Sequence, residues 1–348
     1  MPFLRKHLQS VAGYTPGEQP PSGSPVIKLN TNENPYPPSP EVFRALQSID
    51  PEWLRRYPDP TAIAFRKTAS EVLNIPPDWI TVGNGSDELI SLIMRAVVEP
   101  GAAVVYPMPS YVLYRTVAQI QEAQPIEIAY DEAFTFPLQK ILDAQGAVTF
   151  IASPNSPIGN VVSVEALETL AVNLQGLLVI DEAYVDFTDA NALHLVQHYP
   201  NVIILRTLSK GYSLAGLRLG FAIAHPTLIQ NLNKIKDSYA VDAIAALAGA
   251  AAIRDQAHKN STVQKVLRSR ATLHQNLVEL GFRVWPSEGN FLLVQPPPQE
   301  RSAIALQQHL KTQGILVRHF NLPGVADKLR ITIGTDAQNE QLCQILKK

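Results

Sequence analysis

Short, continuously apolar runs recur along the middle of the chain, and segments with helical spacing separate them. The runs fall at 102–106, 148–152, 177–180, 202–205 and 219–224. Runs of this length are typical of strands that are buried on both faces of a mostly parallel sheet. Helical patterns lie between them, for example at 87–98 and 164–173. The alternation predicts an α/β layer fold with right-handed crossovers.

The pattern changes after about residue 240. An alanine-rich helical stretch covers 243–280, and strand-like runs at 291–295, 315–318 and 329–333 follow it, with helical patterns at 302–312 and 336–347. This order predicts a smaller α+β domain. The first residues are rich in proline, which is typical of an extended arm. We therefore expect an arm over 1–35, a large α/β domain over 36–242 and a small α+β domain over 243–348.

Composition narrows the possible partners. The 348 residues include 29 basic and 31 acidic side chains, so no strong overall field attracts nucleic acid or an anionic membrane. The longest apolar run, 243–253, is about half of the ~20 residues that a membrane span needs. Cys343 is the single cysteine, so neither an intrachain disulfide nor a zinc site is expected. The N-terminus lacks the apolar core of a signal peptide, and we expect a cytoplasmic protein without a bound metal.

Polar motifs follow the predicted strands, where ligands gather in open α/β sheets. In the first, Gly83 and Gly85 allow close approach of the backbone, and Ser86 and Asp87 begin a helix. Free N–H groups at a helix N-terminus suit a phosphate. The alternative is an ordinary capped helix start with nothing bound. The second motif contains Asn155 and has the composition of a surface turn.

Two further motifs carry candidate chemistry. Asp181 ends a buried strand, where an unpaired carboxylate is costly, and it would suit a protonated ring nitrogen; a metal site or a helix cap are the alternatives. The last motif places Lys210 between Thr207, Ser209 and Arg218, which can converge on one phosphate. A lysine amine beside a bound aldehyde forms a Schiff base, whereas an isolated lysine is usually a solvated surface charge.

The four motifs in this order resemble those of the fold-type I pyridoxal 5'-phosphate (PLP) aminotransferases of the aspartate aminotransferase superfamily. The most specific is the Ser-Lys-x-x-x-x-x-Gly-x-Arg run at 209–218. Within the superfamily the chain resembles the histidinol-phosphate aminotransferases. This likeness rests on Leu-Asn-Thr-Asn-Glu-Asn-Pro at 29–35, Arg-Tyr-Pro-Asp at 56–59 and Leu-Arg-Ile-Thr-Ile-Gly at 329–334. It covers nearly the whole chain.

The resemblance implies a role for each motif residue. Lys210 holds PLP as a Schiff base and later acts as a general base, and Asp181 pairs with the pyridine nitrogen. Asn155 and Tyr184 bind the phenolate oxygen, and Tyr111 stacks on the ring, although a core aromatic is the alternative for Tyr111. The phosphate group is bound by Gly85, Ser86, the Asp87 backbone, Thr207, Ser209 and Arg218. Tyr57 reaches it from a neighbouring subunit, so a homodimer with a shared active site is expected.

The resemblance also implies the substrates, which are L-histidinol phosphate and 2-oxoglutarate, converted to imidazole-acetol phosphate and L-glutamate. Arg330 binds the anionic end, and Arg318 is a second candidate, since two guanidinium groups suit a dianionic phosphate. An exposed surface charge is the alternative for Arg318. Tyr14, Asn32 and Asn290 are expected to form walls of the substrate pocket.

Two departures and three alternatives accompany this assignment. Ala240 stands where many relatives have Asn, and Ser-Pro-Ile-Gly at 156–159 replaces the usual Asn-Pro-Thr-Gly, a change that we expect to concern only a turn. The alternatives are an aromatic amino acid aminotransferase, a threonine-phosphate decarboxylase of the same fold, and a regulatory protein on a PLP scaffold without catalysis. The intact pair of Asp181 and Lys210 argues against the last.

Overall fold

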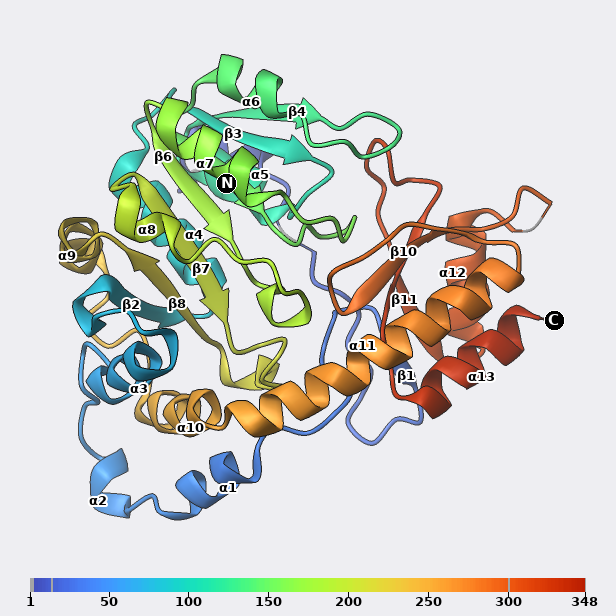
Figure 1. Ribbon diagram of the computed structural model, residues 1–348, viewed down its shortest axis with the longest axis horizontal. Helices are drawn as coiled ribbons and strands as arrows, with labels where there is room; N and C mark the ends of the chain where they lie inside the picture. The colour runs from blue at the N-terminus through green and yellow to red at the C-terminus, as the bar shows by residue number, and fades with distance from the viewer. Residues whose placement is uncertain (1–2, 14, 300, 348) are drawn as a thin grey trace.

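The computed structural model describes residues 3–13, 15–299 and 301–347. It contains two sheets, each with its own hydrophobic core, and the long helix α11 (Gln256–Glu279) runs between them. Figure 1 shows the larger unit on the left and the smaller unit on the right. Among the described residues no helix is both long and apolar enough to cross a bilayer.

The large sheet has seven strands in the order β2-β8-β7-β6-β5-β3-β4. They are β2 (Ile80–Asn84), β3 (Ala103–Met108), β4 (Gln124–Ala129), β5 (Val148–Ala152), β6 (Leu177–Asp181), β7 (Val202–Thr207) and β8 (Leu219–Ala224). All pairings are parallel except the two made by β8. The apolar runs predicted the inner strands well, because β5, β6, β7 and β8 are almost fully buried along their lengths. The edge strand β4 has only exposed and half-buried positions and gave no such run.

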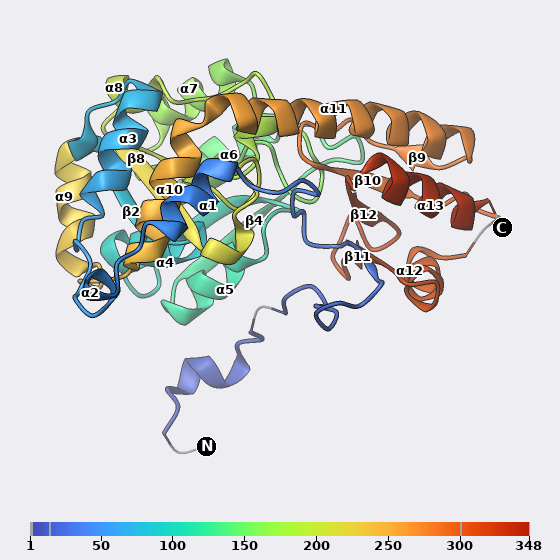
Figure 2. The same cartoon turned by 90° about the horizontal axis from the view of Figure 1, so that it is seen from below.

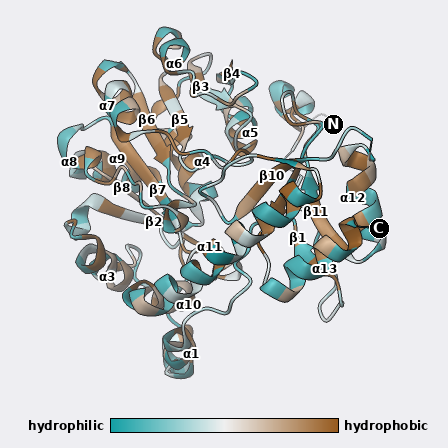
Figure 3. Cartoon of the chain, turned by 45° about the vertical axis from the view of Figure 1, so that its right-hand side comes forward, coloured by the Kyte–Doolittle hydropathy of each residue, from teal (hydrophilic) through white to brown (hydrophobic). Residues whose placement is uncertain are grey.

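Helices cover both faces of this sheet and bury two separate cores. One face carries α4 (Ser86–Val97), α5 (Leu113–Ile120) and α9 (Pro226–Ile235). The other carries α3 (Ile63–Leu73), α6 (Leu138–Ala144), α7 (Val164–Asn173), α8 (Leu195–His198) and α10 (Ala243–Arg254). Figure 3 shows the hydrophobic strands enclosed between helices whose outer faces are hydrophilic. The three-layer arrangement leaves the strand ends as the open edge of the domain.

The small sheet has the order β1-β11-β12-β10-β9. Its strands are β1 (Ile27–Leu29), β9 (Arg283–Val284), β10 (Phe291–Gln295), β11 (Ile315–His319) and β12 (Leu329–Thr332), and α12 (Ala303–Thr312) and α13 (Asp336–Leu346) complete the core. The strand β1 belongs to the segment predicted as an arm, yet it pairs in parallel with β11. Residues 27–29 of the predicted arm are therefore part of the small sheet.

Residues 3–13 lie apart from both cores. The short 3-10 helix η1 (Lys6–Ser10) contacts α5, and the arm trails away from the body in Figure 2. Two short helices, α1 (Pro40–Gln47) and α2 (Pro51–Leu54), then lead into the large domain.

The predicted alanine-rich helix over 243–280 is wrong as a single element. It is divided into α10 and α11 at Asp255, whose side chain accepts the His258 N–H at 3.1 Å and so begins a new helix. Buried residues of α10, including Ala245, Ala248 and Ala252, pack in the core of the large domain. We propose that the domain boundary lies near Asp255 rather than after residue 242.

Candidate active site

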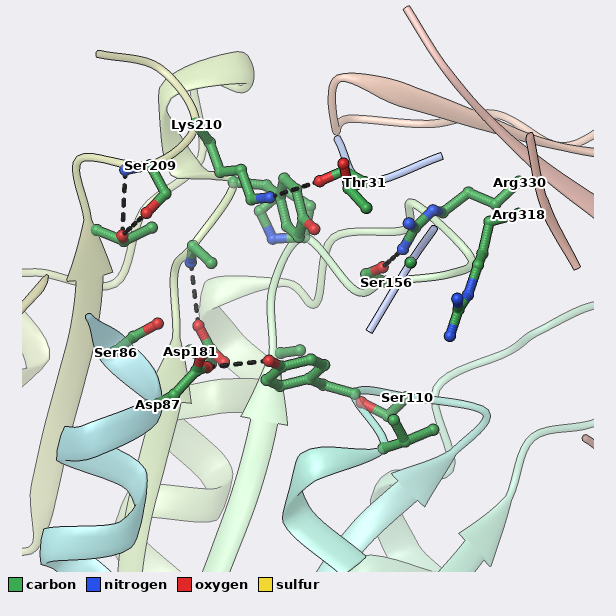
Figure 4. A pocket seen from close by; sticks show the side chains of 18 of the residues that line it. Thr31, Ser86, Asp87, Ser110, Ser156, Asp181, Ser209, Lys210, Arg318 and Arg330 are labelled. Atoms are coloured by element: carbon green, nitrogen blue, oxygen red, sulfur yellow. Dashed lines mark hydrogen bonds between the residues drawn. The ribbon is translucent and has the colours of Figure 1, made fainter. Parts of the chain in front are cut away.

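A cavity of about 240 Å³ lies at the carboxyl ends of β5, β6 and β7, where the small domain faces the large one. Most of the residues predicted from the sequence line it: Ser86, Asp87, Tyr111, Asp181, Tyr184, Thr207, Ser209, Lys210, Arg218, Arg318 and Arg330. Figure 4 shows Ser86, Asp87, Asp181 and Ser209 on one side of it and the two arginines on the other. The cavity thus has two chemically different ends, with Lys210 between them.

One end is a cradle of hydrogen-bond donors around the start of α4. Gly85 caps the helix with φ +80°, and a Cβ built there would lie 2.5 Å from Nη2 of Arg218, so both backbone and space require glycine. A Cβ on Gly220 would lie 2.5 Å from the Ser86 nitrogen, so this glycine lets β8 approach the helix start. Arg218 forms an ion pair with Asp87 at 3.2 Å. The helix N-terminus and the guanidinium group together suit a phosphate.

Hydroxyl groups extend this cradle at the end of β7. Thr207 Oγ1 accepts the Ser209 N–H at 3.1 Å and donates to Ser209 Oγ at 2.9 Å. Arg218 Nη1 lies 3.5 Å from the same Ser209 oxygen. The network brings side chains 11 positions apart onto one point. The cradle combines these donors with two glycines that permit close approach and with a basic side chain. This set of groups fits the phosphate of PLP.

The carboxylate of Asp181 is buried beyond this cradle. Its Oδ2 accepts the Tyr114 hydroxyl at 2.7 Å and its Oδ1 accepts the Ala183 N–H at 3.1 Å. Burial raises the pKa of Asp181 to about 6, and these two hydrogen bonds oppose that rise. Tyr114 was not predicted from the sequence, because nothing in the pattern of α5 shows where its hydroxyl points.

Lys210 projects between the two ends of the cavity. Its amine donates to the Thr31 carbonyl at 3.0 Å and lies 5.7 Å from the centroid of the Tyr184 ring. Burial is the largest influence on the pKa of Lys210 and lowers it, Arg330 adds to the decrease, and Tyr184 opposes it. A lower pKa increases the share of neutral amine, which is the nucleophilic form.

Tyr184 lies beside Lys210 and accepts a hydrogen bond from Asn32 Nδ2 at 2.8 Å. Burial alone would raise the pKa of Tyr184. The positive charges of Lys210 and Arg330 and the hydrogen bonds with Asn32 and Ser156 outweigh burial, and the pKa lies below its ordinary value. The phenol is thereby prepared to interact with an anionic oxygen or to share a proton with the lysine.

Two arginines form the other end. Arg318 on β11 and Arg330 on β12 are directly paired across the antiparallel strands. Side chains at paired positions lie on the same face of a sheet, so the two guanidinium groups reach the cavity together. Arg330 donates to Ser156 Oγ at 2.9 Å and to the Asn30 carbonyl at 2.8 Å. Phe320 lies 5.2 Å from the Arg330 guanidinium.

Arg318 is held by the arm. Its Nη2 lies 3.0 Å from the Thr15 carbonyl and its Nη1 lies 3.4 Å from the Pro16 carbonyl. Gly17, the next residue, lines the cavity. The arm therefore closes the cavity on the side of the arginines.

Other predicted site residues do not line the cavity. Asn155 is fully buried, donates to Ser110 Oγ at 3.2 Å and accepts the Ile158 N–H at 3.3 Å, so its amide braces the loop. Asn290 donates to the Asn32 carbonyl at 2.9 Å and lies behind the wall that it was expected to form. Asn32 is not among the lining residues and contacts the site through Tyr184.

Tyr57 lies outside the cavity as well. Its side chain is 81% exposed and its ring stacks on Tyr239, with centroids 4.5 Å apart. The structure places Gly85 behind Arg218, where its backbone shapes the cradle. Tyr14 lies outside the described residues.

Several residues that line the cavity were not predicted from the sequence: Gly17, Asn30, Thr31, Ser110, Ser156 and Phe320. The departure at 156–159 was expected to concern only a turn, but Ser156 also binds Arg330. Asn30, Thr31 and Ser156 lie in the segments at 29–35 and 156–159 that the sequence singled out, whereas Gly17, Ser110 and Phe320 gave no signal. Thr31 acts through its backbone carbonyl, which no residue type reveals.

A layered α/β fold, a phosphate cradle at a helix start and a half-buried lysine opposite a buried carboxylate define a PLP-dependent enzyme. The family model of the class I and II aminotransferases matches residues 24–346, and the chain belongs to this family.

Relatives of known function agree with the family. The chain is 58% identical over 345 residues to histidinol-phosphate aminotransferase 1 of Trichormus variabilis, covering 99% of this chain and 98% of that one. It is 43% identical over 345 residues to the histidinol-phosphate aminotransferase of Geobacter sp. strain M21, covering 99% of this chain and 98% of that one.

Solved structures show the same fold. The histidinol-phosphate aminotransferase of Sinorhizobium meliloti in complex with pyridoxal-5'-phosphate matches with a TM-score of 0.90 and 26% identity, covering 100% of this chain and 98% of that one. The L-threonine-O-3-phosphate decarboxylase of Porphyromonas gingivalis matches with a TM-score of 0.81 at 21% identity, covering 92% of this chain and 98% of that one. The second likeness concerns the fold alone.

Proposed function

We propose that this enzyme is a PLP-dependent transaminase that converts L-histidinol phosphate and 2-oxoglutarate to imidazole-acetol phosphate and L-glutamate. The observation that carries the substrate assignment is the pair of arginines, Arg318 and Arg330, facing Lys210 across one cavity. Two adjacent guanidinium groups suit a dianionic phosphate better than they suit a single carboxylate. The identity of 58% over nearly the full length to a histidinol-phosphate aminotransferase supports the same substrate.

The residues of the cradle would hold the cofactor. Ser86, Ser209 and Arg218 would bind its phosphate, and Asp181 would face its ring nitrogen, since these groups line the same cavity. When bound, PLP supplies an electron sink for the bond-breaking step at the carbon that bears the substrate's amine. The carboxylate of Asp181 favours a protonated ring nitrogen, because an opposite charge stabilises the charged form.

Lys210 is positioned to move the proton. With its pKa lowered by burial, the amine is available first as a nucleophile and then, once freed, as the base that takes the proton from the substrate's α-carbon. The Thr31 carbonyl at 3.0 Å orients the amine toward the cavity. Tyr184, whose pKa is also lowered, lies close enough to interact electrostatically with the Lys210 amine.

A homodimer with a shared active site is part of the proposal. Tyr57 is 81% exposed, and the exposed apolar side chains Phe43, Trp53 and Leu54 lie on the neighbouring helices α1 and α2. Such a group of large apolar side chains is typical of an interaction surface. We expect Tyr57 to reach the cofactor phosphate of the partner subunit from this surface.

Subunit mixing tests the shared site. Lys210→Ala and Tyr57→Ala chains are each expected to lose activity, and mixed dimers should regain it, because one of their two sites contains both native residues. If Tyr57 acted within its own subunit, mixing would restore nothing.

We also propose a cytoplasmic location, since the buried thiol of Cys343 needs no oxidising compartment, and cell fractionation tests it.

A substrate comparison tests the reaction itself. The purified, PLP-loaded enzyme is assayed with histidinol phosphate, phenylalanine and threonine phosphate, measuring glutamate formed from 2-oxoglutarate and carbon dioxide released. We expect glutamate with histidinol phosphate at the highest kcat/KM and no carbon dioxide. A preference for phenylalanine would indicate an aromatic aminotransferase, and carbon dioxide from threonine phosphate would indicate a decarboxylase. A protein that takes up no PLP would contradict the enzymatic proposal altogether.

A further inference from the structure

Tyr114 contacts the most buried acid of the site without touching the cavity. Its hydroxyl oxygen lies 2.7 Å from Oδ2 of Asp181, and its side chain is 1% exposed. Asp181 lines the cavity, whereas Tyr114 does not. The hydroxyl of Tyr114 therefore acts on the site through Asp181, the residue to which it donates.

Aromatic packing fixes the direction of this hydroxyl. The Tyr114 ring stacks on Phe150 of β5, with centroids 4.7 Å apart and planes inclined by 15°. The Tyr111 ring meets it edge-on at 5.7 Å. A buried ring held from two sides has no alternative rotamer at low cost. The donor is thus aimed at Asp181 before any ligand binds.

The two oxygens of Asp181 have different donors. Oδ2 accepts from Tyr114, and Oδ1 accepts from the Ala183 N–H at 3.1 Å. In the proposed function, Asp181 and the cofactor's ring nitrogen share one proton. A hydrogen bond to the ionised carboxylate stabilises that form and makes Asp181 a weaker base. The donor on Oδ2 therefore influences which of the two partners keeps the proton.

We propose that Tyr114 is a positioning residue that keeps Asp181 ionised, so that the shared proton resides on the ring nitrogen of the bound cofactor. This inference rests on the proposed function. A protonated ring withdraws electrons more strongly than a neutral one, so the location of this proton affects the chemical step more than substrate binding.

The surroundings of Asp181 explain why a donor is needed. Burial raises the pKa of Asp181 to about 6, and the nearby carboxylates of Asp87 and Glu182 add to that rise. Tyr114 and Ala183 are the groups that lower it. Without the Tyr114 hydroxyl, one of the two hydrogen bonds that oppose this rise would be lost, which favours a protonated Asp181 and a neutral ring.

The test uses PLP labelled with ¹⁵N in its ring, bound to wild-type enzyme and to the Tyr114→Phe variant. The ¹⁵N chemical shift reports directly whether the ring nitrogen carries the proton. We expect a protonated nitrogen in the wild type and a shift toward the neutral position in Tyr114→Phe. The value of kcat should fall about tenfold, the loss of one hydrogen bond to a charged group, while KM changes much less.

Tyr106→Phe is the matched control. Tyr106 is also 1% exposed and its ring lies 5.8 Å from Tyr114, but its hydroxyl donates to Glu127 at 2.9 Å. The control should leave the ¹⁵N shift and kcat unchanged. An unchanged shift in Tyr114→Phe, or an equal change in both variants, would overturn the inference. If the wild-type enzyme binds PLP but the variants give either of these results, the inference fails and the proposed function stands. If the wild-type enzyme binds no PLP, both the inference and the proposed function fail.

A second variant covers the case in which Tyr114→Phe does not fold. 3-Fluorotyrosine at position 114 has nearly the same shape and a more acidic hydroxyl, which donates more strongly to Asp181. Asp181 should then accept a weaker hydrogen bond from the protonated ring nitrogen, and the ¹H resonance of that N–H should move upfield. A resonance that stays in place would overturn the inference.

Discussion

The two ends of the cavity are built in different ways. At the cofactor end, Asp87, Asp181, Ser209 and Arg218 all lie on one domain, at or near strand ends of one sheet, and contact one another or Tyr114. At the substrate end, Arg330 lies on the small domain and is held by Ser156 of the large domain and by the Asn30 backbone. The first end is a local assembly, whereas the second exists only when separate segments meet.

The difference teaches where rigidity and adaptability lie. A cradle within one packed domain is preorganised, which lowers the cost of binding the cofactor. An end shared by two domains and the arm changes whenever those parts move. Changes at the cofactor end should therefore affect cofactor binding and the chemical step, and changes at the substrate end should affect substrate binding.

Lys210→Ala should have the largest effect of any single substitution. We expect kcat to fall about 10⁴-fold, at the upper end of general acid–base catalysis, because both the nucleophile and the base are lost. The absorbance band of lysine-bound PLP should disappear as well. Lys236→Ala is the control, since Lys236 is another partly buried lysine that donates to the Val82 carbonyl, at 3.2 Å, away from the cavity. If Lys210→Ala kept both the absorbance band and the activity, Lys210 would neither bind PLP nor act as the base, and the assignment of the cofactor end would be wrong.

Arg330→Ala should affect mainly the substrate end. We expect kcat/KM for histidinol phosphate to fall about 100-fold, because truncating one partner of a buried charged pair costs about 2–5 kcal/mol. The dissociation constant of PLP, measured by absorbance titration, should change less than the kinetics do. Arg283→Ala, which removes an arginine that stacks on Trp285 outside the cavity, should change neither. Equal losses of PLP and substrate affinity would show that the two ends are not separate.

Asp181→Asn should separate stability from function at the cofactor end. The pKa of Asp181 is raised from 3.8 to about 6, so its contribution to stability is present below pH 3.8 and is lost as the pH rises through about 6. At 1.36 kcal/mol per unit, this cost reaches about 3 kcal/mol. In enzyme prepared without PLP, Asp181→Asn should raise the free energy of unfolding by about this amount above pH 7 and by nearly nothing near pH 4.

Urea denaturation at the two pH values measures this stability, and kcat of the loaded variant should fall at the same time. A gain in stability that is equal at both pH values would assign it to something other than ionisation of Asp181.

Ser156→Ala should give the smallest effect. It removes the hydroxyl that accepts from Arg330 at 2.9 Å, and we expect KM for histidinol phosphate to rise about fivefold, the loss of one net hydrogen bond of about 1 kcal/mol. Ser156→Asn, which introduces the residue usual at this position, should retain most of the affinity because an amide oxygen can also accept. An unchanged KM in the alanine variant would show that Arg330 needs no support from the large domain.

The sequence by itself determined the inner strands and the residues of the cofactor end. Continuous apolar runs mark strands buried on both faces, and polar motifs that end such strands necessarily meet at one edge of a parallel sheet. Asp181, Ser209 and Lys210 follow this rule and line one cavity. Local pattern and short connections suffice here, because neighbouring parallel strands fix where their ends lie.

The tertiary structure alone decided the substrate end and the inward or outward direction of side chains in loops. The pairing of Arg318 with Arg330 depends on the register of β11 against β12, and Thr31 and Tyr114 act through contacts 179 and 67 positions away in the chain. Adjacent residues also diverge, since Asn155 turns into the protein and Ser156 into the cavity. Long-range register and loop geometry result from packing between segments, and no local pattern encodes them.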